Sequence, residues 1–237
     1  MSHPPSTLPR VDDFDRVTPA LLRRADEMCP RRLHHEHGSR SKPSPLGDAS
    51  FEVGNRLVED AITWHKGGDP NIPGFPDPRD LEVEQRAAYR AAASAYSARF
   101  GASAVEVHDL GWTTDFPDLG VQLICSPGIT VTSGPVREIR VLRVGGRELL
   151  VDDVEIRCLL LRASEWAPTG FRIVAVDLLE DRSVEYDVDV AARLHDTMEW
   201  FRTQVEMIRA RADRFVAVVG ADCRTCQCIP GCPKVTA

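Results

Sequence analysis

Hydrophobic residues recur at every third or fourth position in several stretches of the chain, a spacing that predicts amphipathic helices. Thr18 is followed by Pro19, and these residue types are preferred at an N-cap and at the first helical position. Asp77 and Pro78 repeat this arrangement further along the chain. We therefore expect helices over residues 18–29, 48–65, 77–100 and 188–213.

Between residues 104 and 179 the hydrophobic period shortens to two and β-branched residues become frequent, which predicts strands. The expected strands cover residues 104–110, 120–125, 136–144, 148–151, 154–162 and 171–179. Helices followed by a mostly antiparallel sheet and a further helix indicate an α/β or α+β fold.

The distribution of these elements predicts one folded domain. We expect the proline-rich residues 1–11 to be disordered. Residues 12–237 should form the domain, with a helical part (12–100), a sheet (104–187), a helix (188–213) and a cysteine-rich tail (220–237). Residues 1–10 lack an apolar signal segment, and no run approaches the ~20 apolar residues of a membrane span. We therefore expect a cytoplasmic protein with no membrane partner.

The net charge of −7 argues against a surface that is basic all over, but it leaves room for a local basic groove that binds DNA. Only Lys42, Lys66 and Lys234 are lysines, and the other basic residues are arginines. The candidates for such a groove are Arg137, Arg140, Arg143, Arg147, Arg157 and Arg162.

Four of the seven cysteines lie close together near the C-terminal end of the sequence: Cys223, Cys226, Cys228 and Cys232. The two-residue spacing of the first pair lets both thiolates reach one metal centre. Thiols stay reduced in the cytosol, which favours metal binding over disulfides. The local cysteines leave the fourth ligand open between Cys228 and a remote cysteine, for which Cys29 is the candidate.

Other possible ligands have simpler interpretations. Cys125 and Cys158 fall within expected strands, and we interpret both as small core residues. The segment that contains His34, His35 and His37 is interpreted as a solvated helix face, since these side chains do not share one face of a helix.

A cysteine followed by proline and arginines at the end of an early helix, combined with the C-terminal C-x2-C-x5-C pattern, resembles the iron–sulfur subset of the RecB-like PD-(D/E)XK nucleases. This subset includes AddB-type helicase–nuclease subunits and the nuclease associated with CRISPR spacer acquisition. The resemblance implies a restriction-endonuclease-like core, with a mixed central sheet flanked by helices. It also implies a 4Fe-4S cluster that joins the N-terminal helix to the tail through Cys29, Cys223, Cys226 and Cys232, with structural zinc as the alternative.

The catalytic motifs of this family are altered in the chain. The first motif resembles "GN-x-V-H", and here Gly54-Asn55 is followed by Val58 in place of the histidine. The second resembles "IRGRIDRVD" and aligns with residues 156–162, which puts Leu161 at the metal-binding aspartate. The third resembles "VDYKTG": Asp177 keeps the carboxylate, but Leu179 replaces the lysine. A fourth motif, Q-x-x-x-Y, would fall near Arg193 and Thr197, which do not match it.

No lysine of the chain has an acidic residue two positions before it, so the sequence contains no D/E-x-K. Arginine is the conceivable replacement, in Glu138-Ile139-Arg140 or in Glu155-Ile156-Arg157 with Asp152 and Asp153 nearby. A guanidinium is poorly suited to proton transfer because it stays protonated. Mg²⁺ or Mn²⁺ needs several hard oxygen ligands, and binding of either ion is therefore doubtful.

Three functions follow from these observations. The first is a catalytically inactive RecB-like protein with a 4Fe-4S cluster that binds DNA or serves as scaffold for a helicase or nuclease in DNA processing or repair. The second is an active metal-dependent DNA exonuclease with relocated catalytic residues. The third is a cluster- or zinc-stabilised protein-interaction module. Whether the protein is an enzyme stays open at this point.

Overall fold

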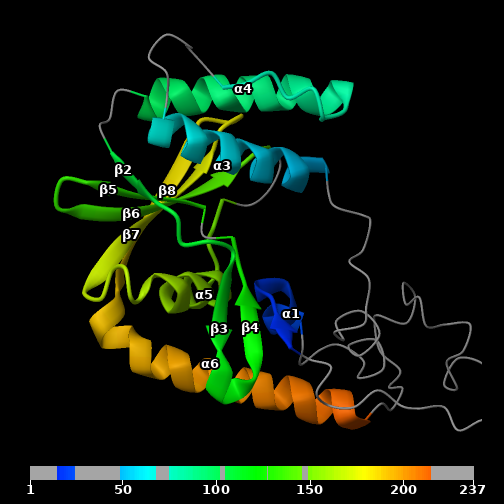
Figure 1. The fold of residues 1–237 in the computed structure, drawn as a ribbon, viewed down its shortest axis with the longest axis vertical. Coiled ribbons are helices and arrows are strands. Elements are labelled where there is room, and N and C mark those ends of the chain that lie inside the picture. The colour runs from blue at the N-terminus through cyan, green and yellow to red at the C-terminus, as the bar shows by residue number, and fades with distance from the viewer. Residues whose placement is uncertain are drawn as a thin grey trace, which may run out of the picture. The chain divides into compact units, whose positions relative to one another are not determined.

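The computed structural model describes residues 15–24, 49–67, 75–101, 105–126, 128–145 and 149–214 (Figure 1). By their internal contacts these residues belong to two units. The larger unit lies within residues 44–112 and 126–195, and the smaller one combines residues from 1–43, 113–125 and 196–237. The expected disordered segment (1–11), three histidines (His34, His35 and His37) and five cysteines (Cys29, Cys223, Cys226, Cys228 and Cys232) lie outside the described residues.

The larger unit is built on a mixed five-stranded sheet of order β2-β5-β6-β7-β8. Its strands are β2 (Glu106–His108), β5 (Ile129–Ser133), β6 (Val136–Arg143), β7 (Gly170–Asp177) and β8 (Arg182–Asp189). Neighbouring strands are antiparallel except for β6 and β7, which are parallel. A parallel pair needs a crossover connection, and the helix α5 (Asp153–Ala163) provides it. The predicted α+β class is confirmed.

Helices α3 (Ala49–Gly67) and α4 (Val83–Phe100) pack on one face of this sheet, and α5 lies on the other face. The core between α3, α4 and the sheet contains residues with exposed fractions close to zero, among them Leu57, Tyr89, Tyr96, Ile129 and Val131. Alternation along the strands explains how both faces are covered, because successive side chains of β5 to β7 point to opposite helical layers.

Helix α5 corrects the prediction of strands over residues 148–151 and 154–162. Residues 149–152 form no regular element, and the segment from Asp153 is helical. The Asp152 carboxylate accepts a hydrogen bond from the Glu155 backbone N–H at 2.8 Å, which is an N-cap interaction. The leucines at 159–161 are all buried, so the second half of this helix lacks the polar face by which a surface helix is predicted from its sequence.

Of two other predicted helix starts, that of α1 (Pro19–Arg24) is confirmed and that of α4 is wrong. Helix α1 begins where expected, and Thr18 Oγ1 accepts a hydrogen bond from the Leu21 N–H at 3.2 Å. Helix α4 begins at Val83 instead of Pro78, with Glu82 as N-cap and the Gln85 side chain bonded to the Glu82 N–H at 3.0 Å. The expected N-cap Asp77 instead binds Arg90 at 2.8 Å.

The smaller unit contains a three-stranded sheet of order β1-β4-β3, formed by β1 (Arg16–Val17), β4 (Val121–Ile124) and β3 (Thr113–Phe116). The 3₁₀ helix η2 (Pro117–Leu119) connects β3 to β4. Its helices are α1 and the residues of α6 (Val190–Arg214) that follow His195. Phe116 packs on Phe201 with ring centroids 4.7 Å apart. No helix of the described residues is both long and apolar enough to cross a membrane.

Candidate functional site at the end of strand β6

A cavity of about 110 Å³ opens in the larger unit where β6 ends. Three elements contribute most of its wall: the first turns of α3, the carboxyl end of β6 and the first turn of α5. The connection that enters β5 closes the remaining side. The lining residues are Gly54, Asn55, Val58, Ser126, Gly128, Val141, Leu142, Arg143, Val144, Gly145 and Glu155.

Glycines let the backbone approach closely around this cavity. Gly128 has a positive φ of 64°, and a Cβ atom there would lie 2.2 Å from the Arg140 carbonyl oxygen. Gly145 also has a positive φ, of 74°. In contrast, a Cβ atom on Gly54 would meet no atom within 4 Å. The glycine of the GN pair is therefore not required by packing in this structure.

One ion pair dominates the polar part of the cavity wall. Arg143 Nη2 lies 2.9 Å from both carboxylate oxygens of Glu155, whose side chain is 16% exposed. The Asn55 side chain forms no hydrogen bond to the described part of the chain. The cavity thus presents a neutralised carboxylate and an amide group to any ligand.

The structure brings together only part of the residues that the motifs predicted. Gly54, Asn55 and Val58 line the cavity, but Leu161 and Leu179 do not. Leu161 is buried on α5, so the segment aligned with the second motif is a helix and not the strand that the resemblance required.

Asp177, the retained carboxylate, lies at the end of β7 and is fully buried. Its Oδ1 accepts hydrogen bonds from the backbone N–H groups of Gly145, Leu179 and Glu180 at 3.4, 3.1 and 3.3 Å. Its Oδ2 lies 3.4 Å from Arg182 Nη2. This carboxylate holds the turn between β7 and β8, and it does not line the cavity.

The arginines proposed for a basic groove are not gathered in one place. Arg140 is buried, lies over the Phe100 ring at 4.0 Å and binds Glu138 at 2.7 Å. Arg162 is also buried and donates to the carbonyl oxygens of Leu110 and Gly111. The others with described side chains also have internal contacts: Arg137 with Trp166, Arg143 with Glu155 and Arg157 with Asp153. Arg147 lies outside the described residues.

The two E-x-R pairs are also engaged in contacts within the protein. Glu138 and Arg140 are paired with each other on β6, whereas Glu155 and Arg157 lie on α5 and bind different partners.

Cys125 and Cys158 are buried, as predicted for core residues, although Cys158 is on a helix. Within the described ranges no group of three or more His, Cys, Asp or Glu residues is arranged to hold a metal ion.

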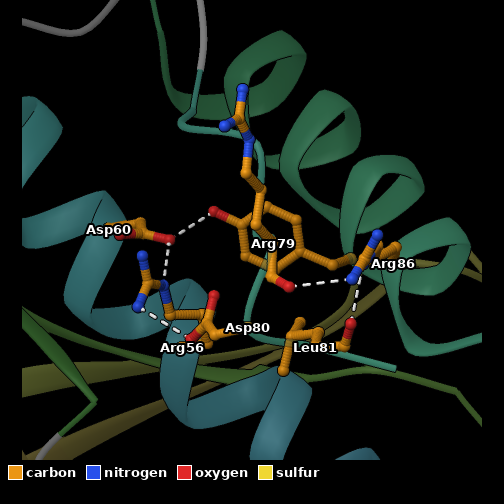
Figure 2. A network of polar contacts seen from close by, with 7 residues as sticks. Arg56, Asp60, Arg79, Asp80, Leu81 and Arg86 are labelled. Atoms are coloured by element: carbon orange, nitrogen blue, oxygen red, sulfur yellow. Dashed lines mark hydrogen bonds and ion pairs between the residues drawn. The ribbon is translucent and has the colours of Figure 1, made fainter. Parts of the chain in front are cut away.

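A network on α3 anchors the helix that forms one wall of the cavity (Figure 2). Asp60 Oδ2 accepts hydrogen bonds from Tyr89 Oη at 2.5 Å and from Arg56 Nε at 2.8 Å. Arg56 also reaches Asp80 at 3.2 Å, in the segment before α4. Burial, followed by the hydrogen bond to Asp60, raises the pKa of Tyr89 above its usual value. The network therefore fixes α3 to α4 through a neutral phenol and a partly buried ion pair.

A second network lies between α3, α4 and β6. His65 Nε2 is hydrogen-bonded to Tyr96 Oη at 2.8 Å, and Tyr96 Oη accepts a hydrogen bond from Arg140 Nη1 at 3.2 Å. Burial and the positive charge of Arg140 lower the pKa of His65 to about 4. A histidine with this pKa is neutral at physiological pH, so it serves as a hydrogen-bonding partner of Tyr96 instead of a cation.

The sequence motifs alone did not identify Arg143 and Glu155 as a pair. One signal was present, because Asp152-Asp153-Val154-Glu155 has the spacing of an N-cap followed by a glutamate in the first helical turn. That signal predicts a helix start at 153, but it does not show that the helix begins beside the end of β6. Comparison with protein-family models finds no matching family, and comparison with curated proteins finds no matching sequence.

Proposed function

We propose that this protein is a catalytically inactive RecB-like nuclease-fold protein that acts as a scaffold or DNA-binding partner in DNA processing or repair. The observation that carries the proposal is the Arg143–Glu155 ion pair in the cavity beside Gly54, Asn55 and Val58. The mixed sheet flanked by helices agrees with the fold class that the family resemblance implies.

The ion pair opposes metal-dependent chemistry for an electrostatic reason. Glu155 is the only carboxylate among the described residues that line the cavity, and a guanidinium already neutralises it. A divalent cation needs several hard oxygen ligands and would have to displace Arg143. Arg143 itself stays protonated and cannot serve as a base that activates water.

The proposal includes a 4Fe-4S cluster held by Cys29, Cys223, Cys226 and Cys232. Its support is the spacing of these residues in the sequence. Thiolate ligands suit this cluster and also suit zinc. The chemistry that the cluster supplies is a crosslink between distant segments of the chain, which lowers the entropy of the unfolded state.

A spectrum and a nuclease assay on anaerobically purified full-length protein test the proposal. We expect a broad absorption band near about 400 nm, typical of an iron–sulfur protein, and no Mn²⁺-dependent cleavage of single- or double-stranded DNA. Cys226→Ala should remove the band and Cys228→Ala, the matched control, should keep it. A featureless spectrum with bound zinc would contradict the cluster. Robust cleavage that Asp177→Ala abolishes would contradict the inactive state.

The internal contacts of the arginines favour a second candidate, a protein-interaction module that does not bind nucleic acid. Arg140 and Arg162 are buried, and Arg143 is bound to Glu155, so these side chains are not offered to phosphates. A gel-shift titration with labelled single-stranded DNA separates a DNA-binding partner from a protein that contacts other proteins alone. Binding that weakens steeply with salt supports a DNA-binding partner, because phosphate contacts release counterions. No shift at low salt supports the protein-interaction module.

A further inference from the structure

Strand β8 forms one edge of the five-stranded sheet. It is eight residues long and pairs with β7 on one side, and no described strand pairs with its other side. An edge strand leaves alternate backbone N–H and C=O groups without sheet partners, so it is a template for a further strand. Five of its residues are exposed: Arg182, Ser183, Glu185, Asp187 and Asp189.

Charges alternate across the sheet toward this edge. The register aligns Glu138 on β6 with Arg172 on β7, and Arg172 with Asp187 on β8. Arg172 Nε lies 3.2 Å from Asp187, and Arg172 Nη1 lies 3.3 Å from Glu185. One cation therefore serves two carboxylates on the edge strand, which leaves an excess negative charge there.

The two carboxylates are available to a further partner. The Asp187 side chain is 86% exposed and that of Glu185 is 56% exposed, although both contact Arg172. Opposite charges on directly opposed residues stabilise neighbouring strands. The next position in this ladder therefore favours lysine or arginine.

The other face of β8 carries apolar and aromatic side chains. Val184 and Tyr186 are partly buried there and Val188 is buried. Tyr186 Oη accepts a hydrogen bond from the Val151 N–H at 3.3 Å, which orients its ring along this face. An added strand would fit β8 if basic residues alternate with β-branched or other apolar residues.

We propose that β8 binds an extended basic segment of a partner protein as a sixth strand of the sheet. Lysine or arginine side chains of the segment lie against Glu185 and Asp187, and its apolar side chains lie beside Val184 and Tyr186. Main-chain hydrogen bonds supply affinity in this mode, and the side-chain pattern supplies specificity.

Charge excludes two other occupants. Symmetric pairing of β8 with a second copy of the chain would bring the carboxylates of both copies together, and like charges on opposed residues are destabilising. Nucleic acid would place negatively charged phosphates beside the carboxylates of Glu185 and Asp187, and these like charges repel each other. The basic strand is the occupant that complements this edge.

The inference deepens the scaffold role and rests on it only for the existence of a protein partner. Its test is independent of cleavage and of the cluster spectrum. If the peptide does not bind, the conclusions from the nuclease assay and the spectrum are unaffected. If those two tests fail, the result of the peptide-binding test is unaffected.

The experiment measures fluorescence anisotropy of a labelled peptide, as long as β8, in which lysine alternates with valine or threonine. The full-length protein should bind it. Charge reversal in Glu185→Lys with Asp187→Lys should weaken binding about tenfold, since each opposed charge pair changes from attraction to repulsion. The neutral variant, Glu185→Gln with Asp187→Asn, should weaken peptide binding less than the charge reversal does. It keeps the test valid if the charge-reversed variant does not fold.

The matched control reverses two exposed glutamates of the same unit, Glu59→Lys with Glu84→Lys, and should leave peptide binding unchanged. Peptides N-methylated along one edge test pairing of the main chain: methylation of one alternate set of residues should abolish binding, and methylation of the other should not. The proposal is overturned if the wild-type protein does not bind. It is also overturned if the control variant loses affinity equally, if both methylated peptides bind, if single-stranded DNA displaces the peptide from this edge, or if the protein self-associates through β8.

Discussion

Arg143 and Glu155 join the end of β6 to the first turn of α5, with both oxygens of the carboxylate 2.9 Å from one guanidinium nitrogen. Their side chains are 26% and 16% exposed. Solvent and salt screen such a pair less than a pair on the open surface. The contact therefore stabilises the crossover between the two parallel strands as well as neutralising the cavity.

Removal of this carboxylate should destabilise the protein. We expect Glu155→Gln to lower the free energy of unfolding by about 1–3 kcal/mol, because the variant leaves the partly buried Arg143 without its counter-charge. Urea denaturation measures the change. A double-mutant cycle with Arg143→Met isolates the coupling between the two residues.

The control for this prediction is the exposed pair of Arg202 and Glu199 on α6. Arg202→Gln should change stability by less than about 0.5 kcal/mol, as expected for an exposed helical ion pair. Equal effects of the two substitutions would show that the Arg143–Glu155 contact is no stronger than a surface pair.

The Asp60 network offers a test of how α3 is held to α4. We expect Asp60→Ala to lower the free energy of unfolding by about 2–4 kcal/mol, because the Tyr89 hydroxyl and the Arg56 guanidinium both lose their acceptor. Tyr89→Phe should cost less, about 1–2 kcal/mol, since it removes only one hydrogen bond. Thermal and urea denaturation both report the difference.

Asp80 provides a matched control, because it also binds Arg56 but is 60% exposed. Asp80→Ala should change stability by no more than about 1 kcal/mol. A loss as large as that of Asp60→Ala would mean that the exposed arm of the network holds the two helices together.

The acid side of the stability profile should depend on His65. Its pKa is lowered to about 4 from an ordinary value of 6.5, so the unfolded chain binds more protons between these two pH values. The stability contributed by neutral His65 is fully present above about pH 6.5 and is lost as the pH falls toward 4.

We therefore expect the wild-type protein to lose more stability between neutral pH and pH about 4 than His65→Gln, whose side chain does not titrate. Urea denaturation across this range gives the two profiles, and other titrating groups cancel in the comparison. Nuclear magnetic resonance of the His65 ring gives the folded pKa directly. A midpoint at or above 6.5 for this ring would refute the prediction.

Local signals in the sequence predicted several elements well. Thr18 caps α1 as expected, and the alternating pattern of residues 136–144 forms β6. Signals of this kind act over a few residues, so they are readable without knowledge of the tertiary structure. Strands β1, β3, β5 and β8 lie outside the predicted strand ranges. Two to four residues carry too little periodicity to predict β1 and β3, whereas β8 covers eight residues at the sheet edge and five of them are polar or charged.

The helical state of α5 determines which residues belong to the site. A strand over residues 154–162 placed Leu161 at a motif position, whereas the helix places Glu155 at the cavity and buries Leu161 elsewhere. Residues 158–163, the second half of this helix, are all buried, so this half lacks the polar face that identifies a surface helix. The pairing of Arg143 with Glu155 depends on tertiary structure, and no spacing rule in the sequence predicts it.

Two of the three glycines that line the cavity, Gly128 and Gly54, should respond to substitution in opposite directions. Gly128→Ala forces a Cβ atom to within 2.2 Å of the Arg140 carbonyl oxygen, at a residue that already has a positive φ. The backbone must shift, and we expect a loss of about 2–4 kcal/mol or more in the free energy of unfolding. Gly54→Ala meets no atom within 4 Å and lies inside α3, so it should stabilise the protein by about 0.5–1 kcal/mol.

Gly134→Ala separates the two contributions at Gly128, because Gly134 also has a positive φ but open space around its Cβ position. Its cost should be about 1–2 kcal/mol, which is the penalty of the left-handed conformation alone. Urea denaturation of the three variants gives the comparison. If Gly128→Ala costs no more than Gly134→Ala, the close approach of the backbone at the cavity wall does not constrain the fold. If Gly54→Ala is destabilising, the glycine beside Asn55 has a packing role that its open surroundings do not account for.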